Sequence, residues 1–345
     1  MTTLRALRRP DAVPLMAANH CVNVCAATDL VRSHVPTSDG VSLSVREYGS
    51  AAASRTVVLL HGCCLDKESW CLQVEALIER WGTDIRIIAY DHRGHGDSGQ
   101  APMHTYTVQR LAADLAELLV ALGVSGRVYF MGHSLGAMSI LAYAALPADQ
   151  RPVEPDGLVL IATAAGKLTE RGLGRLLTNP VIDLLYELVR HAPRASTDAI
   201  VRAAARPIWR QLTRFGYANP TGGTAVLAKA AAGAINATPL ATKIGFLRDL
   251  RGYDQSSTLP SITAQTIVLA GERDLLTPPT HGRDLAAGIA GATLVQLPGV
   301  GHMLLHEAPH VVTDAIDALL GGRRPDNSDR QRDPERSPAL AGAAS

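Results

Sequence analysis

The sequence predicts an α/β fold with a mostly parallel central sheet, helices on both of its faces and a helical block inserted into it. Short continuous apolar runs, typical of strands that are buried on both faces, alternate with stretches of helical periodicity. Such alternation is typical of a parallel sheet that helices cover on both sides. The alternation stops over residues 164–260 and then resumes, which indicates an inserted block.

The first half of the sheet is expected between residues 31 and 163. Alternating residues flank Ser38-Asp39-Gly40, and this pattern predicts a β-hairpin with its turn residues in place. Helical spacing of apolar residues follows near 70–78, over 107–122 and directly after residue 136. The buried strands expected between these helices are 56–61, 85–90, 127–132 and 157–163.

The second half of the chain completes the core after the inserted block. The block contains helical segments at 176–190, 197–214 and 224–250; strands at 266–271 and 292–297 and helices near 281–290 and 308–320 follow it. We therefore expect a core of residues 31–163 and 261–320 with a helical cap of residues 164–260. The cap should cover the edge of the sheet where open α/β sheets bind ligands. We expect a flexible extension at 1–30 and a disordered polar tail at 321–345.

The composition excludes several classes of function. Lys and Arg number 33 against 32 Asp and Glu, which leaves no basic surplus for a nucleic-acid partner. No apolar run approaches the roughly 20 residues that a membrane-spanning helix needs. Five cysteines, an odd number, indicate no disulfide framework, so we expect a reducing, cytoplasmic location. Export and peripheral membrane attachment are the less favoured alternatives.

Residues Gly132 to Gly136 read GHSLG and lie between an apolar strand and an apolar helix. A serine hydroxyl is a poor nucleophile until a base takes its proton, and it must stand clear of its own helix to react. A tight strand-to-helix turn achieves this when small residues flank the serine. The bare pattern also occurs in glycine-rich turns that only cap a helix, but the flanking elements favour a nucleophile at Ser134, with His133 as part of the motif.

His61 and Gly62 end the predicted strand at 56–61. Attack on a carbonyl creates an oxyanion, which needs hydrogen-bond donors that already point at it. We expect one donor to be the amide of Leu135, after the nucleophile, and the other to be the amide of Cys63, after this strand. An ordinary turn is the alternative interpretation of His61-Gly62.

Asp274 and His302 follow the two later strands and complete the pattern. A base needs a pKa near the working pH, which favours histidine, and a buried carboxylate fixes its tautomer. The chain order Ser, Asp, His is the order that this architecture requires. A turn-forming aspartate is the alternative for Asp274. His306 and His310 enter the last helix, and we expect them to face solvent or to cap it.

Two further groups invite functional interpretations that we do not favour. Cysteines 63, 64 and 71 with His61 suggest a metal site, but adjacent cysteines seldom reach one tetrahedral ion, so no metal is expected. A redox-sensitive Cys63 stays an open alternative. In DHRGHGDS (91–98), the glycines suit tight turns, and Arg93 and Asp97 suit charge-assisted hydrogen bonds between loops. We expect that segment to be structural.

Together these motifs resemble the α/β-hydrolase superfamily over residues 31–320, the cap excepted. In the family's order they are the hairpin with Asp39-Gly40, HG at 61–62, DHRGHGDS, GHSLG, GERDLLTP and GVGHMLLHEAP. The resemblance implies an α/β-hydrolase fold, a triad of Ser134, Asp274 and His302, and an oxyanion hole of the Cys63 and Leu135 amides. It is nearest to the serine esterase, monoacylglycerol-lipase-like and haloperoxidase-like branch. Cys63-Cys64 departs from the family, which often has a bulky apolar residue, glycine or proline there.

The expected function is hydrolysis of a carboxylic ester through an acyl-enzyme, without a cofactor. Apolar cap residues such as Leu177 and Ile182 suggest a small, lipophilic ester as the partner, although we favour their assignment to the cap's own core. One alternative is the same triad acting on a thioester, a lactone or a C–C bond, or in perhydrolysis. The other is a non-catalytic ligand-binding protein. The alanine-rich cap leaves a homodimer open.

Overall fold

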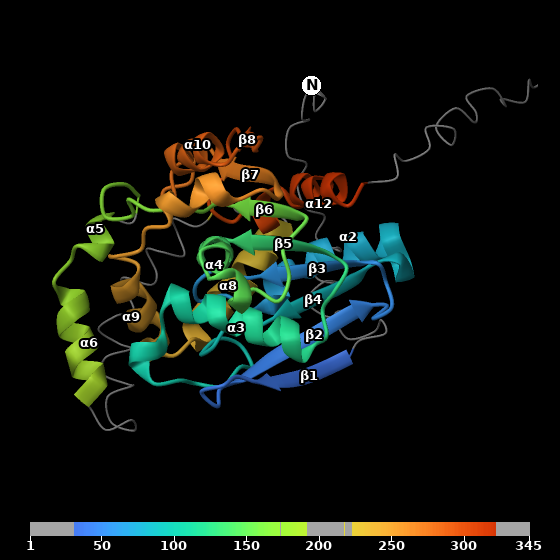
Figure 1. Cartoon of the computed structure of the whole chain (residues 1–345). Helices are drawn as coiled ribbons and strands as arrows, with labels where there is room; N and C mark the ends of the chain where they lie inside the picture. The colour runs from blue at the N-terminus through green and yellow to red at the C-terminus, as the bar shows by residue number, and fades with distance from the viewer. Residues whose placement is uncertain (1–30, 173, 192–216, 218–222, 322–345) are drawn as a thin grey trace, which may run out of the picture.

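The computed structural model describes residues 31–172, 174–191, 217 and 223–321. The predicted extension at 1–30, the predicted helix over 197–214 and the tail after residue 321 lie outside these residues. Figure 1 shows the described part as a central sheet between layers of helices. The predicted fold class, a mostly parallel α/β sheet with helices on both faces and helices inserted into it, is confirmed.

The described strands form one sheet in the order β1-β2-β4-β3-β5-β6-β7-β8. The first pair is the predicted hairpin, and β2 also runs antiparallel to β4, whereas all later neighbours are parallel. The strands are β1 (Val31–Pro36), β2 (Ser42–Gly49), β3 (Arg55–Leu60), β4 (Arg86–Tyr90), β5 (Arg127–His133), β6 (Gly157–Ile161), β7 (Gln265–Gly271) and β8 (Thr293–Leu297).

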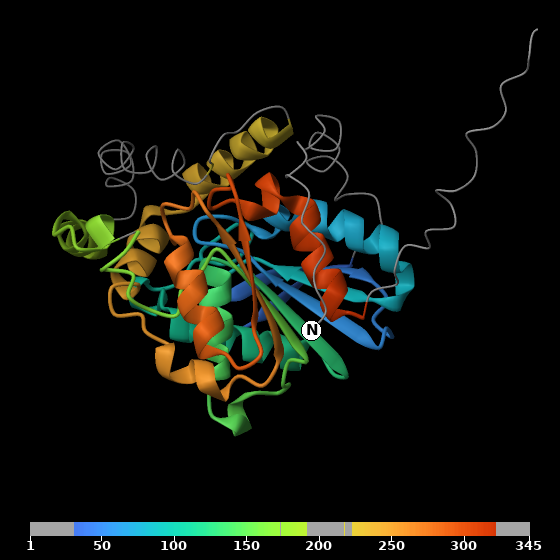
Figure 2. The same cartoon turned by 90° about the horizontal axis from the view of Figure 1, so that it is seen from above.

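Two apolar cores lie on the two faces of this sheet because successive side chains of a strand point to opposite sides. Val58 and Leu60 of β3 belong to one core, whereas Val57 and Leu59 belong to the other. Figure 2 shows the two helical layers on either side of the strands. The first core is covered by α3 (Val108–Ala121), α4 (Leu135–Ala144) and α10 (Pro279–Gly288), and the second by α2 (Cys71–Trp81), α11 (Leu304–Glu307) and α12 (Pro309–Leu319).

The inserted helices come between β6 and β7 in the chain. They are α5 (Gly174–Leu177), α6 (Val181–His191), α8 (Gly223–Ala237) and α9 (Leu240–Asp249). The two ends of this insertion meet, since the amide of Gln255 donates a hydrogen bond of 2.6 Å to the carbonyl of Ala165. Short 3-10 helices connect other elements: η1 (Lys67–Trp70), η2 (Gly82–Asp84), η3 (Met103–Thr105), η4 (Ala148–Gln150) and η5 (Ser256–Ser261).

Two observations concern compartment and membrane. Among the described residues, no helix has the length and apolar content needed to cross a membrane. Cys71 is disulfide-bonded, whereas Cys63 and Cys64 are free thiols. The sequence predicted no disulfide framework; one bonded cysteine is compatible with that prediction, because an odd cysteine count excludes only complete pairing.

Candidate active site

Ser134 lies on the sharp turn between β5 and α4. Its backbone has φ 51° and ψ −114°, a conformation that side-chain-bearing residues rarely adopt and that is costly to hold. A Cβ atom at Gly132 would lie 2.5 Å from Cα of Ala137, and one at Gly136 would overlap the carbonyl oxygen of Leu60. The spacing of the two glycines around the serine is thus a steric requirement of the turn.

Asp274 and His302 form a buried pair at the ends of β7 and β8. The Nδ1 atom of His302 donates to Oδ2 of Asp274 at 2.7 Å, and the residues are 6% and 2% exposed. The other carboxylate oxygen accepts hydrogen bonds from the amides of Leu276 (2.8 Å) and Thr277 (2.9 Å). Burial alone would raise the pKa of Asp274, but the His302 ring and these donors lower the pKa below its usual value. The carboxylate therefore stays ionised beside the ring.

Thr277 is a member of this site that the sequence reasoning did not identify. Its hydroxyl donates to Oδ2 of Asp274 at 2.7 Å and lies 3.2 Å from Nδ1 of His302. A threonine three residues after an aspartate is a turn signal, because an Asp side chain often bonds backbone amides just after it. That signal marks the turn, but it does not indicate that the hydroxyl touches the histidine's partner.

His133, the second residue of GHSLG, contacts His302 and holds its backbone in place. Its Nε2 atom donates to the backbone carbonyl of His302 at 3.0 Å, and the two ring centroids are 5.0 Å apart. Burial, followed by the neighbouring His302 ring, lowers the pKa of His133 to about 3, so its ring is neutral. A Cβ atom at Gly62 would lie 2.6 Å from Nδ1 of His133, which explains a glycine after His61.

A cavity of about 110 Å³ connects Ser134 and His302 with the inserted helices. Its walls are mostly apolar. The core contributes Leu135, Met138, Leu276 and Met303, and the inserted helices contribute Ala228, Ala231, Ala232 and Ile235 of α8 and Leu247 and Leu250 of α9. Leu177 and Ile182 lie in the large apolar core instead, and Leu184 is 69% exposed.

The two expected oxyanion donors, Cys63 and Leu135, also border this cavity. Leu135 is the first residue of α4, so its amide has no acceptor within the helix. Among the described residues, neither this amide nor that of Cys63 donates to a protein acceptor. Donors without a partner of this kind are what the expected oxyanion hole requires.

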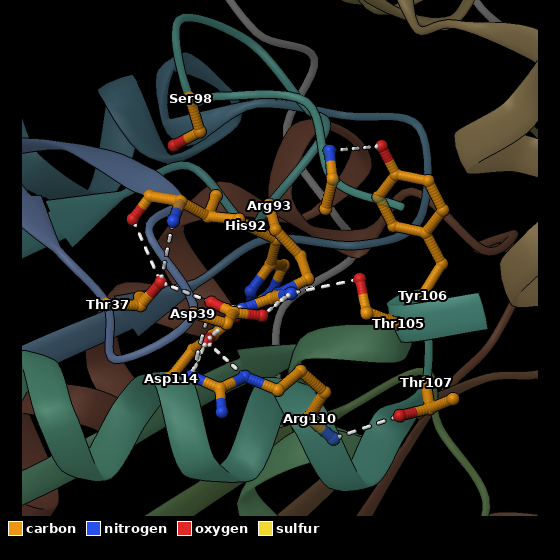
Figure 3. A network of polar contacts seen from close by, with 12 residues as sticks. Thr37, Asp39, His92, Arg93, Ser98, Thr105, Tyr106, Thr107, Arg110 and Asp114 are labelled. Carbon is orange, nitrogen blue, oxygen red and sulfur yellow. Dashed lines mark hydrogen bonds and ion pairs between the residues drawn. The ribbon is translucent and has the colours of Figure 1, made fainter. Parts of the chain in front are cut away.

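The DHRGHGDS segment is a structural clamp, in agreement with its interpretation from sequence. Figure 3 shows Arg93, which is fully buried, between two carboxylates. Its guanidinium donates two hydrogen bonds to Asp114 of α3 (2.6 and 2.7 Å) and two to Asp39 of the hairpin turn (2.8 and 3.0 Å). Oδ2 of Asp91 accepts from the ammonium of Lys67 at 2.6 Å, which anchors the loop after Cys64.

Three histidines hold this segment against the loop that carries Cys63. The amide of His92 donates to Nε2 of His61 at 2.9 Å, and Nε2 of His92 donates to the carbonyl of His61 at 3.1 Å. The amide of Cys64 donates to Nε2 of His95 at 3.0 Å. Burial lowers the pKa of His61 well below its usual value and that of His92 to about 3. His61 therefore acts as a neutral structural residue behind the cavity.

His306 is buried, so the prediction that it faces solvent or caps a helix is wrong. The hydroxyl of Tyr217, which borders the cavity, donates to its Nδ1 atom at 2.6 Å, and its Nε2 atom donates to the carbonyl of Ser69 at 3.2 Å. The short helix α11 places the side chain of His306 in the interior. The sequence predicted the last helix only from residue 308, so it did not predict this helix or the burial of His306. Burial lowers the pKa of His306 to about 4.

Comparisons with known proteins identify the family and the fold. The model of the Alpha/beta hydrolase family matches residues 57–315. RutD of Caulobacter sp. (strain K31), named a carbamate hydrolase, is 28% identical over 290 residues, 83% of this chain and 97% of that protein. A hydrolase from Pseudomonas aeruginosa PA01 is 30% identical with a TM-score of 0.67, over 86% of this chain and 100% of that one. The esterase EaEST from Exiguobacterium antarcticum shares the fold at 22% identity with a TM-score of 0.69, over 85% of this chain and 100% of that one.

Proposed function

The chain belongs to the alpha/beta hydrolase family, and from that premise we propose that it hydrolyses carboxylic esters with Ser134 as nucleophile, His302 as base and Asp274 as the orienting acid. The observation that carries the proposal is the buried hydrogen bond of 2.7 Å between His302 and Asp274, beside a cavity that Ser134 and His302 both border. A histidine that a carboxylate orients, close to a serine on a tight turn, is the arrangement that activates a hydroxyl.

The reaction would proceed through an acyl-enzyme. Ser134 Oγ attacks the ester carbonyl and gives its proton to Nε2 of His302, because Nδ1 is engaged with Asp274. The amides of Leu135 and Cys63 stabilise the oxyanion. His302 returns the proton to the departing alcohol, then takes a proton from the water that attacks the acyl group. His302 gives that proton to Ser134 Oγ as the bond between Oγ and the acyl carbon breaks, which restores the hydroxyl and releases the acid.

The walls of the cavity favour a small apolar acyl or alcohol group. Among the described residues of the insertion, those that border the cavity are apolar apart from Tyr217, which precedes α8. The side of α8 that faces it consists largely of alanine, so its width is set by the backbone of α8 and by the larger residues opposite. We therefore expect short-chain and medium-chain esters to be better substrates than long-chain ones.

A carbamate is the second candidate substrate, and the similarity to RutD over 97% of that protein favours it. Attack by Ser134 on a carbamate carbonyl needs the same base and the same oxyanion donors. The two candidates differ in the leaving group and in the acyl group left on the serine, so a substrate panel separates them.

The test is turnover of p-nitrophenyl esters of increasing acyl length and of an aryl carbamate by the wild type and by Ser134→Ala. We expect the variant to lose at least about 10⁴-fold in kcat, as triad serines do. Ser139→Ala is the matched control, because Ser139 lies in α4, directly after the turn that carries Ser134, but donates its hydroxyl to the carbonyl of Gly136.

Labelling with a fluorophosphonate completes the experiment. Ser139→Ala should be labelled like the wild type, and Ser134→Ala should not be labelled. Ester turnover that persists in a folded Ser134→Ala variant would disprove the proposal. Labelling without turnover of any substrate in the panel would support Ser134 as the nucleophile but contradict ester hydrolysis.

A further inference from the structure

Two free thiols face each other in the wall of the cavity. Sγ of Cys63 and Sγ of Cys64 are 3.6 Å apart, and both residues border the cavity with Ser134. Cys64 has φ 63°, a left-handed conformation that is unusual for a residue with a side chain. The backbone thus takes a costly conformation at the pair itself, a pattern found where local geometry serves a function.

The surroundings of the pair favour a reactive thiolate. The hydrogen bond with Cys63 lowers the pKa of the Cys64 thiol, burial opposes this, and the nearby Lys243 ammonium also lowers it. Lys243 of α9 is 5% exposed, so its charge acts through little water. Cysteines that react with oxidants lie in electropositive places of this kind.

A metal ion does not account for the cluster, although Cys63, Cys64 and His95 bring three ligand atoms within 4.8 Å of one another. Both ring nitrogens of His95 are already engaged, since Nε2 accepts from the amide of Cys64 at 3.0 Å and Nδ1 donates to the carbonyl of Arg93 at 3.0 Å. Two adjacent thiols without a third ligand form a poor tetrahedral site.

We propose that Cys63 and Cys64 are an oxidative modification site, at which a hydroperoxide closes the pair to a disulfide and switches off hydrolysis. With hydrogen peroxide, the Cys64 thiolate attacks one oxygen, the O–O bond breaks, and the other oxygen leaves as water after taking a proton. Cys63 sulfur then attacks the sulfenic sulfur of Cys64, the S–O bond breaks, and a second water leaves with the thiol proton. Two thiols and one peroxide become one disulfide and two waters.

Closure would disturb the oxyanion donor, a consequence that rests on the proposed function. The sulfurs must approach from 3.6 Å to about 2.0 Å, in a small ring that includes the peptide bond between the two residues. The amide of Cys63 is attached to that ring. Loss of one oxyanion donor costs about 10²–10³-fold in kcat. Adjacent Cα atoms are about 3.8 Å apart, below the usual range of about 4.4–6.8 Å, so the disulfide is strained and readily reduced.

The experiment treats the full chain with hydrogen peroxide, alkylates it and digests it with trypsin. Cleavage after Arg55 and Lys67 gives a peptide, residues 56–67, that contains Cys63 and Cys64 and no other cysteine. We expect this peptide to carry two alkyl groups before treatment. After treatment it should carry none and be lighter than the free dithiol peptide by two hydrogen atoms. Ester turnover should fall about 10²-fold and return with dithiothreitol.

Cys64→Ser and Cys63→Ser provide the comparison, each judged by the ratio of its own treated and untreated rates. We expect these ratios to stay within about twofold of one, because a single thiol cannot close the ring. A peptide that stays doubly alkylated after peroxide overturns the proposal. So does a disulfide that leaves turnover unchanged, or an equal and reversible loss in both variants. The peptide mass needs no enzyme activity, so failure of the ester assay alone contradicts the proposed function and not the thiol chemistry.

Discussion

At the scale of single residues, the site depends on a buried carboxylate, Asp274, that stays ionised and oriented toward the His302 ring. Asp274 accepts hydrogen bonds from two backbone amides, the Thr277 hydroxyl and the His302 ring. A buried carboxylate without such donors would take up a proton instead. The tight turn after β7 therefore does more than connect elements, because it supplies the donors that fix the charge.

Thr277→Val tests this dependence. The variant removes the hydroxyl that bonds Oδ2 of Asp274 but keeps the backbone amide, so we expect kcat to fall about tenfold. The lost donor lowers the pKa of Asp274 in the wild type, so that pKa rises in the variant, and the part of the acid limb of the kcat/KM profile that follows protonation of Asp274, below about pH 4, moves to higher pH. The matched control is Thr313→Val, whose hydroxyl bonds the carbonyl of Pro309 in α12. Profiles with coincident acid limbs would contradict the role of Thr277.

At the scale of elements, the junction of β5 and α4 is set by close backbone approach rather than by side-chain packing. The helix starts so near β3 that a methyl group at Gly136 has no space beside the carbonyl of Leu60. The opposite holds on α8, where a Cβ atom at Gly233 would meet nothing within 4 Å. Gly136 has no space for a side chain, whereas Gly233 has space for one. We therefore expect substitution by alanine to have opposite effects at the two positions.

Gly136→Ala and Gly233→Ala form a matched pair for urea unfolding. We expect Gly136→Ala to lower the free energy of unfolding by about 1–3 kcal/mol through overpacking, and to lower turnover because Ser134 shifts. Gly233→Ala should raise it by about 0.5–1 kcal/mol, since alanine favours a helix. Equal changes in the free energy of unfolding for the two substitutions would contradict the steric role of Gly136 beside the carbonyl of Leu60.

The sequence predicted the elements of the core well and the shape of the cavity poorly. Runs such as RTVVLL are apolar because both faces of the strand are buried, so β3 to β7 could be recognised from composition alone. Ser134, Asp274 and His302 each follow a predicted strand, and the structure brings Asp274 and His302 together at 2.7 Å. The alanines of α8 gave no such signal, because a small side chain suits a cavity wall, a core or solvent. Likewise, the contact between Tyr217 and His306 joins positions 89 apart in the chain.

At the scale of the whole molecule, several buried histidines stay neutral in the folded state. Burial lowers the pKa of His92 and His133 to about 3 and of His306 to about 4, and lowers that of His61 well below its usual value. In the unfolded chain, each would take up a proton near pH 6.5. As the pH falls from about 6.5 toward about 4, the unfolded state therefore binds protons that the folded state does not, and stability is lost.

We expect the free energy of unfolding to fall between pH 7 and pH 5, by up to about 1.4 kcal/mol per pH unit for each of these histidines. Asp274 contributes in a lower window, because its pKa is lowered on folding and its contribution is lost only as the pH falls below about 4. Urea unfolding at several pH values measures the slope. His306→Gln should reduce that slope by about one proton, and His104→Gln, at an exposed position, should leave it unchanged. A free energy that is constant from pH 7 to pH 5 would refute the buried neutral rings.

The hydrogen bond between Gln255 and Ala165 joins the two ends of the insertion, so the inserted helices could be replaced without moving the points where the chain leaves and re-enters the core. The chain leaves the sheet and returns to it through one narrow neck, where a Cβ atom at Gly166 would lie 2.7 Å from the carboxylate of Asp254. Loop closure costs depend only weakly on the length of chain between two fixed points. A segment grafted between these two positions would therefore leave the strand ends that carry Ser134, Asp274 and His302 undisturbed. Substrate range and catalytic machinery can thus diverge independently in this architecture.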